Sequence, residues 1–271
     1  MIDDPEDTAM RSALGTLRGR IALVTGAGQG VGRATALTLS RQGAEAVVVN
    51  DFHLDRAEAV AREIEAAGGR ALAVQADVSD FDSVRRMFER AAGAAGRVDV
   101  LVNNAGNAGP DPIGELPRFW DADPADWQRW LGTNLFGVMN CCHAALPGMI
   151  ARERGRIVTV ISDAGRIGDA NYVVYSGAKG GAAGFMKGLA RAVGRYDVTA
   201  NCVSLAAINT PGLAERLADP QRRKKVLANY VIRRVGEPQD AAAAIAFLAS
   251  DAASWVTGQT WAVNGGYSFG Q

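Results

Sequence analysis

One glycine-rich segment constrains the fold of this chain more than any other feature of its sequence. An apolar run at 21–24 is followed at 25–32 by TGAGQGVG and then by a stretch with helical periodicity. A strand that turns through glycines into a helix begins a βαβ unit, because glycine permits the tight turn and lets other groups approach the backbone. The N–H groups at the start of such a helix bind pyrophosphate. The sequence therefore predicts a dinucleotide phosphate site formed by Gly26, Gln29, Gly30, Val31 and Gly32.

Apolar strands and helical segments alternate along nearly the whole chain. Helices are expected at about 54–67, 81–95, 124–152 and 172–196, between apolar strands such as AEAVVVND, VDVLVNN and RIVTVIS. Parallel strands that are covered by helices on both faces have this continuous apolar character. The sequence therefore predicts an α/β fold, namely a Rossmann-type doubly wound, seven-stranded parallel sheet with helices on both faces.

Neither an internal repeat nor a linker that would separate a second domain is visible in the sequence. We therefore expect an N-terminal tail at 1–17 and a single Rossmann-fold domain at 18–271. Two stretches, about 107–123 and 207–236, follow strand ends and mix proline and glycine with apolar residues. Because open α/β sheets bind ligands at strand ends, these stretches are the expected walls of a substrate pocket. The apolar residues of the second stretch favour an apolar substrate; they are Leu213, Leu217, Val226 and Leu227.

The charges of the chain balance, with 29 basic and 29 acidic residues. Such a protein has no net field that attracts nucleic acid, so no nucleic-acid partner is expected. Residues 1–18 lack the basic start and apolar run of a signal peptide, and no apolar run approaches the ~20 residues of a membrane span. A cytoplasmic protein without a membrane partner is expected. Cys141, Cys142 and Cys202 are expected to be buried, reduced packing residues, and no metal site is expected.

An acidic residue, Asp51, ends the second predicted strand nineteen residues after Gly32. A carboxylate at this place accepts hydrogen bonds from the ribose hydroxyls of an adenosine, and it would repel the 2′-phosphate of NADP. The position therefore favours NAD as the cofactor. His53 and Arg56 lie close enough along the chain to keep NADP open. Asp51 taken alone also fits the role of a helix cap.

Two side chains with acid/base chemistry, Tyr175 and Lys179, are four residues apart in a predicted helix and therefore lie on one face of it. An ammonium group beside a phenol favours the phenolate, so this pair could exchange protons near neutral pH. Ser162 ends a predicted strand, where its hydroxyl could hold or polarise a carbonyl oxygen. Asn134 lies inside a predicted helix, where it could hold a water or bend the backbone. Each residue taken alone also fits a purely structural role.

In their order along the chain, these motifs resemble the short-chain dehydrogenase/reductase family, and the resemblance extends from about Arg18 to Gly266. TGAGQGVG resembles the family's glycine motif, and Asp77-Val78 its adenine-contacting pair. The N-N-A-G motif is matched by residues 103–106, which places Asn104, Ala105 and Gly106 at the cofactor. Ile208 and Thr210 align with the residues that contact the nicotinamide carboxamide. The resemblance implies an NAD(P)-dependent oxidoreductase, and Asp51 favours NAD as the cofactor.

The same resemblance assigns a catalytic tetrad to Asn134, Ser162, Tyr175 and Lys179. It implies that Tyr175 is the acid/base and that Ser162 places the substrate oxygen. Lys179 would bind the nicotinamide ribose and lower the pKa of the tyrosine, and Asn134 would hold a water of the proton relay. Tyr175 and Lys179 thus also count as cofactor-binding residues. The resemblance further implies a homotetramer.

Two positions depart from the family pattern. Residues 204–207 read SLAA where the family usually has a P-G pair, and Asp163 follows the serine of the tetrad.

The function expected is an NAD(H)-dependent oxidoreductase that interconverts a small-molecule secondary alcohol and a ketone. The alternatives are a catalytically inactive NAD(P)-binding sensor protein, an NADP-dependent carbonyl reductase, and a sugar-nucleotide epimerase or dehydratase, which usually needs a larger C-terminal domain.

Overall fold

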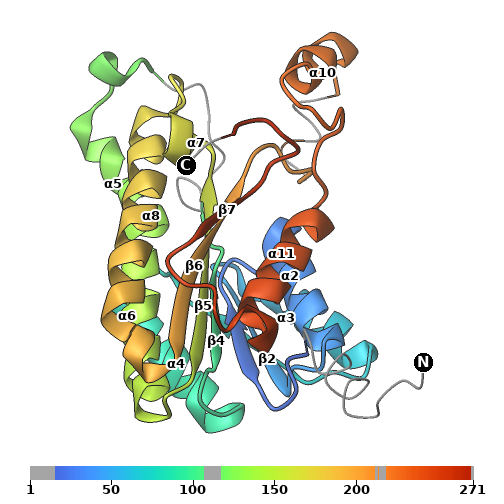
Figure 1. Cartoon of the computed structure of the whole chain (residues 1–271), viewed down its shortest axis with the longest axis vertical. Helices are drawn as coiled ribbons and strands as arrows, with labels where there is room; N and C mark the ends of the chain where they lie inside the picture. The colour runs from blue at the N-terminus through green and yellow to red at the C-terminus, as the bar shows by residue number, and fades with distance from the viewer. Residues whose placement is uncertain (1–15, 107–116, 211–212, 214–217, 270–271) are drawn as a thin grey trace.

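A sheet of seven parallel strands lies at the centre of the protein (Figure 1). The structure is a computed structural model, and it describes residues 16–106, 117–210, 213 and 218–269. The strand order is β3-β2-β1-β4-β5-β6-β7, so the direction of winding reverses between β1 and β4. The predicted seven-stranded parallel sheet is confirmed. Its strands are β1 (Ile21–Val24), β2 (Ala46–Asp51), β3 (Ala71–Gln75), β4 (Val100–Asn103), β5 (Gly155–Ser162), β6 (Val198–Leu205) and β7 (Thr260–Val263).

Helices cover both faces of the sheet, as Figure 1 shows. Buried residues such as Leu39, Ile64 and Ile245 join one face to three helices, α2 (Gly30–Arg41), α3 (Leu54–Ala66) and α11 (Pro238–Ala249). Residues such as Met87 and Met186 join the other face to α4 (Phe81–Ala94), α6 (Gly137–Ala151) and α8 (Val173–Val193). The shorter elements are α5 (Trp127–Leu131), α7 (Ala164–Ile167), α10 (Pro220–Leu227) and the 3-10 turns Phe119–Asp121, Pro124–Asp126, Gly194–Tyr196 and Asp251–Ala253.

The helix expected over 124–152 is interrupted, and the prediction of one continuous helix was wrong. A π-helical turn, η3 (Gly132–Phe136), separates α5 from α6. Within it the Asn134 side chain donates a hydrogen bond to the carbonyl oxygen of Trp130, 2.9 Å away. A side chain that bonds the backbone carbonyl four residues earlier competes with the regular helix. Apolar periodicity alone does not reveal this local competition.

Parts of three expected segments lie outside the described residues, namely 1–15 of the tail, 107–116 of the first loop, and 211–212 and 214–217 of the second. Leu217 belongs to the last of these. Leu17 is fully buried, and its N–H donates to the Gln42 carbonyl oxygen, 2.9 Å away. None of the helices formed by described residues is long and apolar enough to span a membrane.

Candidate active site

The loops that follow β1 and β4 are held together where the strand order reverses. The Thr25 hydroxyl oxygen accepts hydrogen bonds from the backbone N–H groups of Asn104 and Ala105, each 3.0 Å away. In return the Asn104 amide donates to the carbonyl oxygens of Thr25 and Gly26, at 3.0 and 2.9 Å. Open α/β sheets bind their ligands at such a reversal point. The Thr25 hydroxyl was not among the predicted site residues, although its place at the strand end before the glycine motif was visible in the sequence.

The glycine segment leaves no room for side chains at the start of α2. A Cβ on Gly32 would lie 2.2 Å from the Gly26 carbonyl oxygen and 2.4 Å from the Asn104 amide nitrogen. Gly30 has a φ of +55°, and a Cβ there would lie 3.2 Å from the methyl group of Thr210. Thr210 therefore lies beside the glycine segment, although it is far away in the sequence. The first turn of α2 carries no acidic residue, so the positive end of this helix is suited to an anion.

Asp51 ends β2 directly beside the glycine segment. Its buried carboxylate accepts hydrogen bonds from the backbone N–H groups of Gly28 and His53, at 2.9 and 3.0 Å. A Cβ on Gly28 would lie 2.7 Å from this carboxylate and 2.5 Å from Cβ of Arg56. A carboxylate at this place can also accept hydrogen bonds from the hydroxyl groups of a ribose. The side chain of Arg56, beside this carboxylate, is exposed.

Asp77 and Val78 lie in the segment after β3 and are fixed in place by neighbouring side chains. The Asp77 carboxylate accepts hydrogen bonds from the N–H and the hydroxyl of Ser79, at 2.8 and 2.7 Å. The Val78 carbonyl accepts a hydrogen bond from the Asn140 side chain of α6, 3.0 Å away. A Cβ on Gly137 would lie 2.7 Å from the Val78 side chain. The start of α6 therefore packs closely against this segment.

The structure brings three of the predicted catalytic side chains together. Tyr175 shares a side-chain hydrogen bond with Ser162. The Lys179 ammonium lies 5.8 Å from the centre of the Tyr175 ring and donates to the Val160 carbonyl oxygen, 2.9 Å away. Together these contacts place a phenol, a hydroxyl and an ammonium group at the carboxyl end of β5.

The fourth predicted catalytic residue, Asn134, is fully buried and lies near the same group of side chains. A Cβ on Gly106 would lie 3.1 Å from the Asn134 amide oxygen and 3.2 Å from the Lys179 ammonium. The segment after β4 thus passes directly beside the candidate catalytic side chains. A side chain there would press on both polar groups, which would have to shift by a few tenths of an ångström.

Burial controls the ionisation of the tyrosine and the lysine. It raises the pKa of Tyr175 above the usual value for a phenol, and the hydrogen bond with Ser162 lowers it only in part. Burial also lowers the pKa of Lys179 to about 8. The sequence led us to expect that Lys179 would lower the pKa of the tyrosine. The loss of hydration on burial dominates instead and raises the pKa of Tyr175, so the phenol is protonated at neutral pH.

Two aromatic rings lie against the Tyr175 ring. The Trp130 ring meets it edge to face with the ring centres 5.6 Å apart, and the Tyr172 ring does so at 6.3 Å. Trp130 and Tyr172 also contact each other at 6.2 Å. Trp130 is buried, whereas the Tyr172 side chain is partly exposed, so Tyr172 presents apolar surface that suits a substrate with apolar rings.

The two departures from the family pattern are hydrogen-bonded to each other. The Ser204 hydroxyl of β6 donates to the Asp163 carboxylate, 2.7 Å away. Burial alone would raise the pKa of Asp163, but hydrogen bonds from Ser204, Asn264, Ser268 and Arg166 hold it below the ordinary value. The charged form of this buried carboxylate is therefore stable at neutral pH.

Among the described residues no group of three His, Cys, Asp or Glu side chains could hold a metal ion.

Comparison with known proteins gives relatives over most of the chain. A family model described as enoyl-(acyl carrier protein) reductase matches residues 26–268. A cis-4-hydroxycyclohexanecarboxylate dehydrogenase of Sinomonas cyclohexanicum is 44% identical, with 92% of this chain and 96% of that protein covered. A 7α-hydroxysteroid dehydrogenase of Escherichia coli is 36% identical over 92% and 94%.

A solved structure supports the same relationship. It is a gluconate 5-dehydrogenase from Burkholderia cenocepacia in complex with NADP and tartrate, with a TM-score of 0.87 and 31% identity. The alignment covers 95% of this chain and 98% of that one. The expected fold and family are therefore confirmed by sequence and by structure.

Proposed function

The chain belongs to the short-chain dehydrogenase/reductase family, whose related members interconvert hydroxyl and carbonyl groups, and we propose that this one acts with NAD(H) on a mainly apolar, cyclic secondary alcohol. The observation that carries the proposal is the cluster of Ser162, Tyr175 and Lys179 at the carboxyl end of β5. A phenol hydrogen-bonded to a hydroxyl beside a buried ammonium is suited to move a proton to or from a substrate oxygen.

In the proposed mechanism Ser162 holds the substrate oxygen, and Tyr175 exchanges the proton with it. The protonated phenol gives its proton to the oxygen during ketone reduction and removes the hydroxyl proton during alcohol oxidation, after it has ionised. Lys179 stabilises the phenolate by its charge and would hold a ribose of the cofactor. Asn134 holds a water that passes the proton towards solvent. The cofactor, when bound, would accept the hydride as NAD⁺ in alcohol oxidation and donate it as NADH in ketone reduction.

The residues around the glycine segment fit a dinucleotide. Gly26, Gln29, Gly30, Val31 and Gly32 would hold its phosphates, because there is no room for a Cβ at Gly26 or Gly32 and the first turn of α2 carries no acidic residue. Asp77, Val78, Asn104, Ala105, Gly106, Ile208 and Thr210 would complete the cofactor site.

Asp51 favours NAD over NADP in this proposal. Its carboxylate would accept hydrogen bonds from the adenosine ribose and would repel a phosphate attached there. The gluconate 5-dehydrogenase with NADP shows that the fold also accepts the phosphorylated cofactor. We therefore propose that the side chain at position 51, rather than the fold, decides the preference.

The substrate class rests on two independent observations. The Trp130 and Tyr172 rings pack against the candidate acid/base, and the Tyr172 side chain is partly exposed beside it. Two relatives are named as dehydrogenases of a hydroxycyclohexanecarboxylate and of a hydroxysteroid. Both of these substrates have a hydroxyl group on a carbon ring. We therefore place cyclohexanols and their ring-fused analogues ahead of open-chain alcohols.

The first test follows NADH absorbance while the protein is offered NAD⁺ or NADP⁺ with cyclohexanols, hydroxysteroids and hydroxyacyl thioesters. We expect turnover of a cyclic alcohol and a preference for NAD⁺. Tyr175→Phe should abolish turnover and leave NADH binding intact. The control is Tyr196→Phe, which changes a tyrosine beyond the far end of α8 and should leave turnover unchanged. NADH binding without turnover of any alcohol would favour the cofactor-sensing alternative instead.

A second test addresses the cofactor. Asp51→Ala should weaken the preference for NAD⁺ over NADP⁺ by at least about tenfold, because a carboxylate facing a phosphate is removed. The ratio of kcat/KM values for the two cofactors measures this effect. An unchanged ratio would show that Asp51 does not select the cofactor.

We also propose a homotetramer in the cytoplasm, with one Rossmann-fold domain per chain. The stacked rings of Phe247 and Trp261, 5.3 Å apart, are each partly exposed, and Trp255 is almost fully exposed. Exposed aromatic surface of this kind is suited to contact with another subunit. Light scattering after gel filtration gives the mass of the assembly, and a monomer would contradict the proposal.

A further inference from the structure

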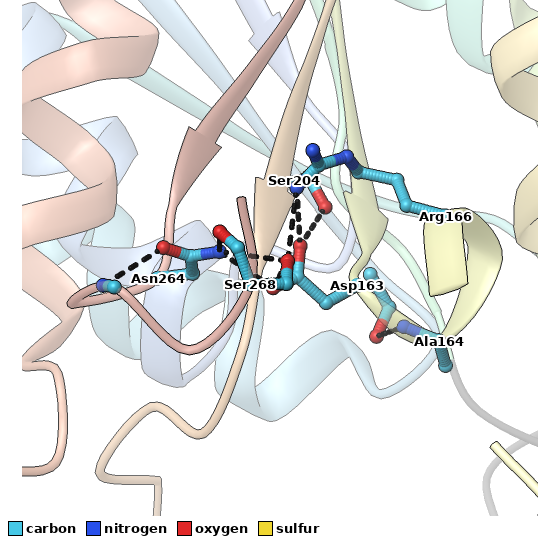
Figure 2. A network of polar contacts seen from close by, with 8 residues as sticks. Asp163, Ala164, Arg166, Ser204, Asn264 and Ser268 are labelled. Carbon is cyan, nitrogen blue, oxygen red and sulfur yellow. Dashed lines mark hydrogen bonds and ion pairs between the residues drawn. The ribbon is translucent and has the colours of Figure 1, made fainter. Parts of the chain in front are cut away.

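The Asp163 carboxylate follows the candidate catalytic serine and is surrounded by hydrogen-bond donors, as Figure 2 shows. The side chain is 2% exposed. One oxygen accepts from Ser204 at 2.7 Å and from Arg166 at 3.0 Å. The other accepts from Asn264 at 2.6 Å and from Ser268 at 2.8 Å. A buried charge is stable only when it is satisfied in this way.

The donors join parts of the chain that are far apart in the sequence. Asn264 and Ser268 belong to the segment 264–268, which follows β7. Within this segment the Asn264 side chain donates to the Ser268 carbonyl oxygen and accepts from the Gly266 N–H, each at 3.0 Å. The Ser268 hydroxyl also accepts from Arg166, 3.2 Å away. The segment 264–268 is therefore folded on itself and tied to Asp163 and α7.

On its other side Asp163 is joined to the candidate catalytic residues. The backbone N–H of Ala164 donates to the Ser162 hydroxyl oxygen, 3.2 Å away. This bond uses one lone pair of the hydroxyl and so restricts the directions in which it can donate. In the same turn, a Cβ on Gly165 would lie 2.7 Å from Cβ of Lys179. The short helix α7 thus touches Ser162 at its start and Lys179 through Gly165.

We propose that Asp163 is a positioning residue whose carboxylate holds the segment 264–268 against α7 and so fixes the Ser162 hydroxyl relative to Tyr175. The inference rests on the proposed function for its kinetic test. Its physical basis is that Asp163 is the N-cap residue of α7, and its carbonyl oxygen also accepts from the N–H groups of Arg166 and Ile167, each at 2.9 Å. A change in the carboxylate bonds therefore moves the turn that orients Ser162.

The kinetic test compares Asp163→Asn with a matched control. Asp99→Asn changes another buried carboxylate, which accepts from the Ile21 N–H and from Arg152 at the amino end of β4. Both substitutions remove a buried charge that has an arginine partner. We expect Asp163→Asn to lower kcat on the order of tenfold or more, because small displacements of catalytic groups have effects of this size. Its dissociation constant for NADH should change less than about twofold, and Asp99→Asn should leave kcat unchanged.

Ser268→Ala is a milder variant that keeps the charge of Asp163. It removes a hydroxyl that contacts Asp163, Arg166 and Asn264. We expect kcat to fall by several-fold, in the same direction as for Asp163→Asn and without a change in NADH binding. If the wild type turns over an alcohol and kcat is the same in Asp163→Asn and in Ser268→Ala, the inference is overturned and the proposed function stands.

Hydrogen–deuterium exchange tests the coupling without any turnover. In Asp163→Asn the amides of α7 and of the segment 264–268 should exchange faster together, and in Asp99→Asn they should not. If the wild-type protein turns over no alcohol, the proposed function is contradicted. The exchange rates would still show whether Asp163 couples α7 to the segment 264–268. Unchanged exchange in either of these two regions in Asp163→Asn would overturn it.

Discussion

The ammonium group of Lys179 donates a hydrogen bond to the backbone carbonyl of Val160, 2.9 Å away, inside the protein. Burial lowers the pKa of this lysine to about 8. The folded protein therefore carries a charge that water would solvate better. A buried ammonium group disfavours folding, but at this position it lies beside the candidate acid/base, where its charge stabilises the phenolate.

Lys179 should make the stability of the protein depend on pH. Its pKa is lower in the folded chain than in the unfolded chain, so the unfolded chain binds more protons between about pH 8 and 10.5. Stability therefore rises with pH through this range, and the full cost of the buried charge is present below pH 8. Lys179→Met should stabilise the protein without cofactor by about 1 to 3 kcal/mol at pH 7, after the lost hydrogen bond is subtracted.

Urea unfolding at pH 7 and at pH 9.5 measures this effect. The gain from Lys179→Met should shrink at the higher pH, because the wild-type lysine is then neutral. Lys187→Met is the control, since Lys187 lies on the same helix with an exposed side chain. A gain of equal size at both pH values would contradict the buried-charge explanation.

Much of the fold could be predicted because local sequence determines it. The apolar run at 21–24, the glycines after it and the helical periodicity that follows are adjacent in the chain, and each agrees with the same βαβ unit. The break at Gly132–Phe136 could not be predicted in this way. It depends on which carbonyl the Asn134 side chain bonds, and periodicity carries no information about that choice.

The candidate site shows a similar division. Ser162, Tyr175 and Lys179 were identified from their residue types and spacing, and the structure brings them together. The partnership of Asp163 with Ser204 was not foreseen, although both positions were noted as unusual. Their contact depends on the pairing of β5 with β6 and on the return of the chain after β7. The pKa of Tyr175 depends on burial, which spacing does not report.

The Thr25 hydroxyl should be essential to the joined loops. Thr25→Val keeps the shape of the side chain but leaves the N–H groups of Asn104 and Ala105 without their acceptor. We expect a loss of about 2 kcal/mol or more in the free energy of unfolding and weaker NADH binding. Thr25→Ser keeps the acceptor and should lose less than about 1 kcal/mol, the value of one buried methyl group. Equal losses in the two variants, measured by urea unfolding, would exclude the hydroxyl as the cause.

The three cysteines should be unreactive in the folded protein. All are buried, and burial raises the pKa of Cys142 and of Cys202 to about 12 and that of Cys141 further in the same direction. Because the thiolate is the reactive form, iodoacetamide at pH 8 should modify none of them within an hour. In guanidinium chloride all three should react, as mass spectrometry would show. A rapid adduct on the native protein would mean that one thiol is accessible.

Gly32 and Gly93 offer a matched pair of glycines in helices. A Cβ on Gly32 would overlap the Gly26 carbonyl oxygen at 2.2 Å, whereas a Cβ on Gly93 meets no atom within 4 Å. Gly93→Ala should therefore stabilise the protein by about 0.5 to 1 kcal/mol, since alanine has less freedom to lose in a helix. Gly32→Ala should destabilise it by about 1 to 3 kcal/mol, because the overlapping backbone atoms must move apart.

The same pair distinguishes a general effect on folding from a local effect on the cofactor site. The displaced atoms in Gly32→Ala include the carbonyl of Gly26 and the Asn104 amide, both in the expected phosphate-binding region. Fluorescence titration should therefore show at least about tenfold weaker NADH binding for Gly32→Ala, under conditions in which circular dichroism shows it folded. Gly93→Ala should bind NADH as the wild type does. If Gly32→Ala were folded and bound NADH normally, the glycine segment would not be the phosphate site.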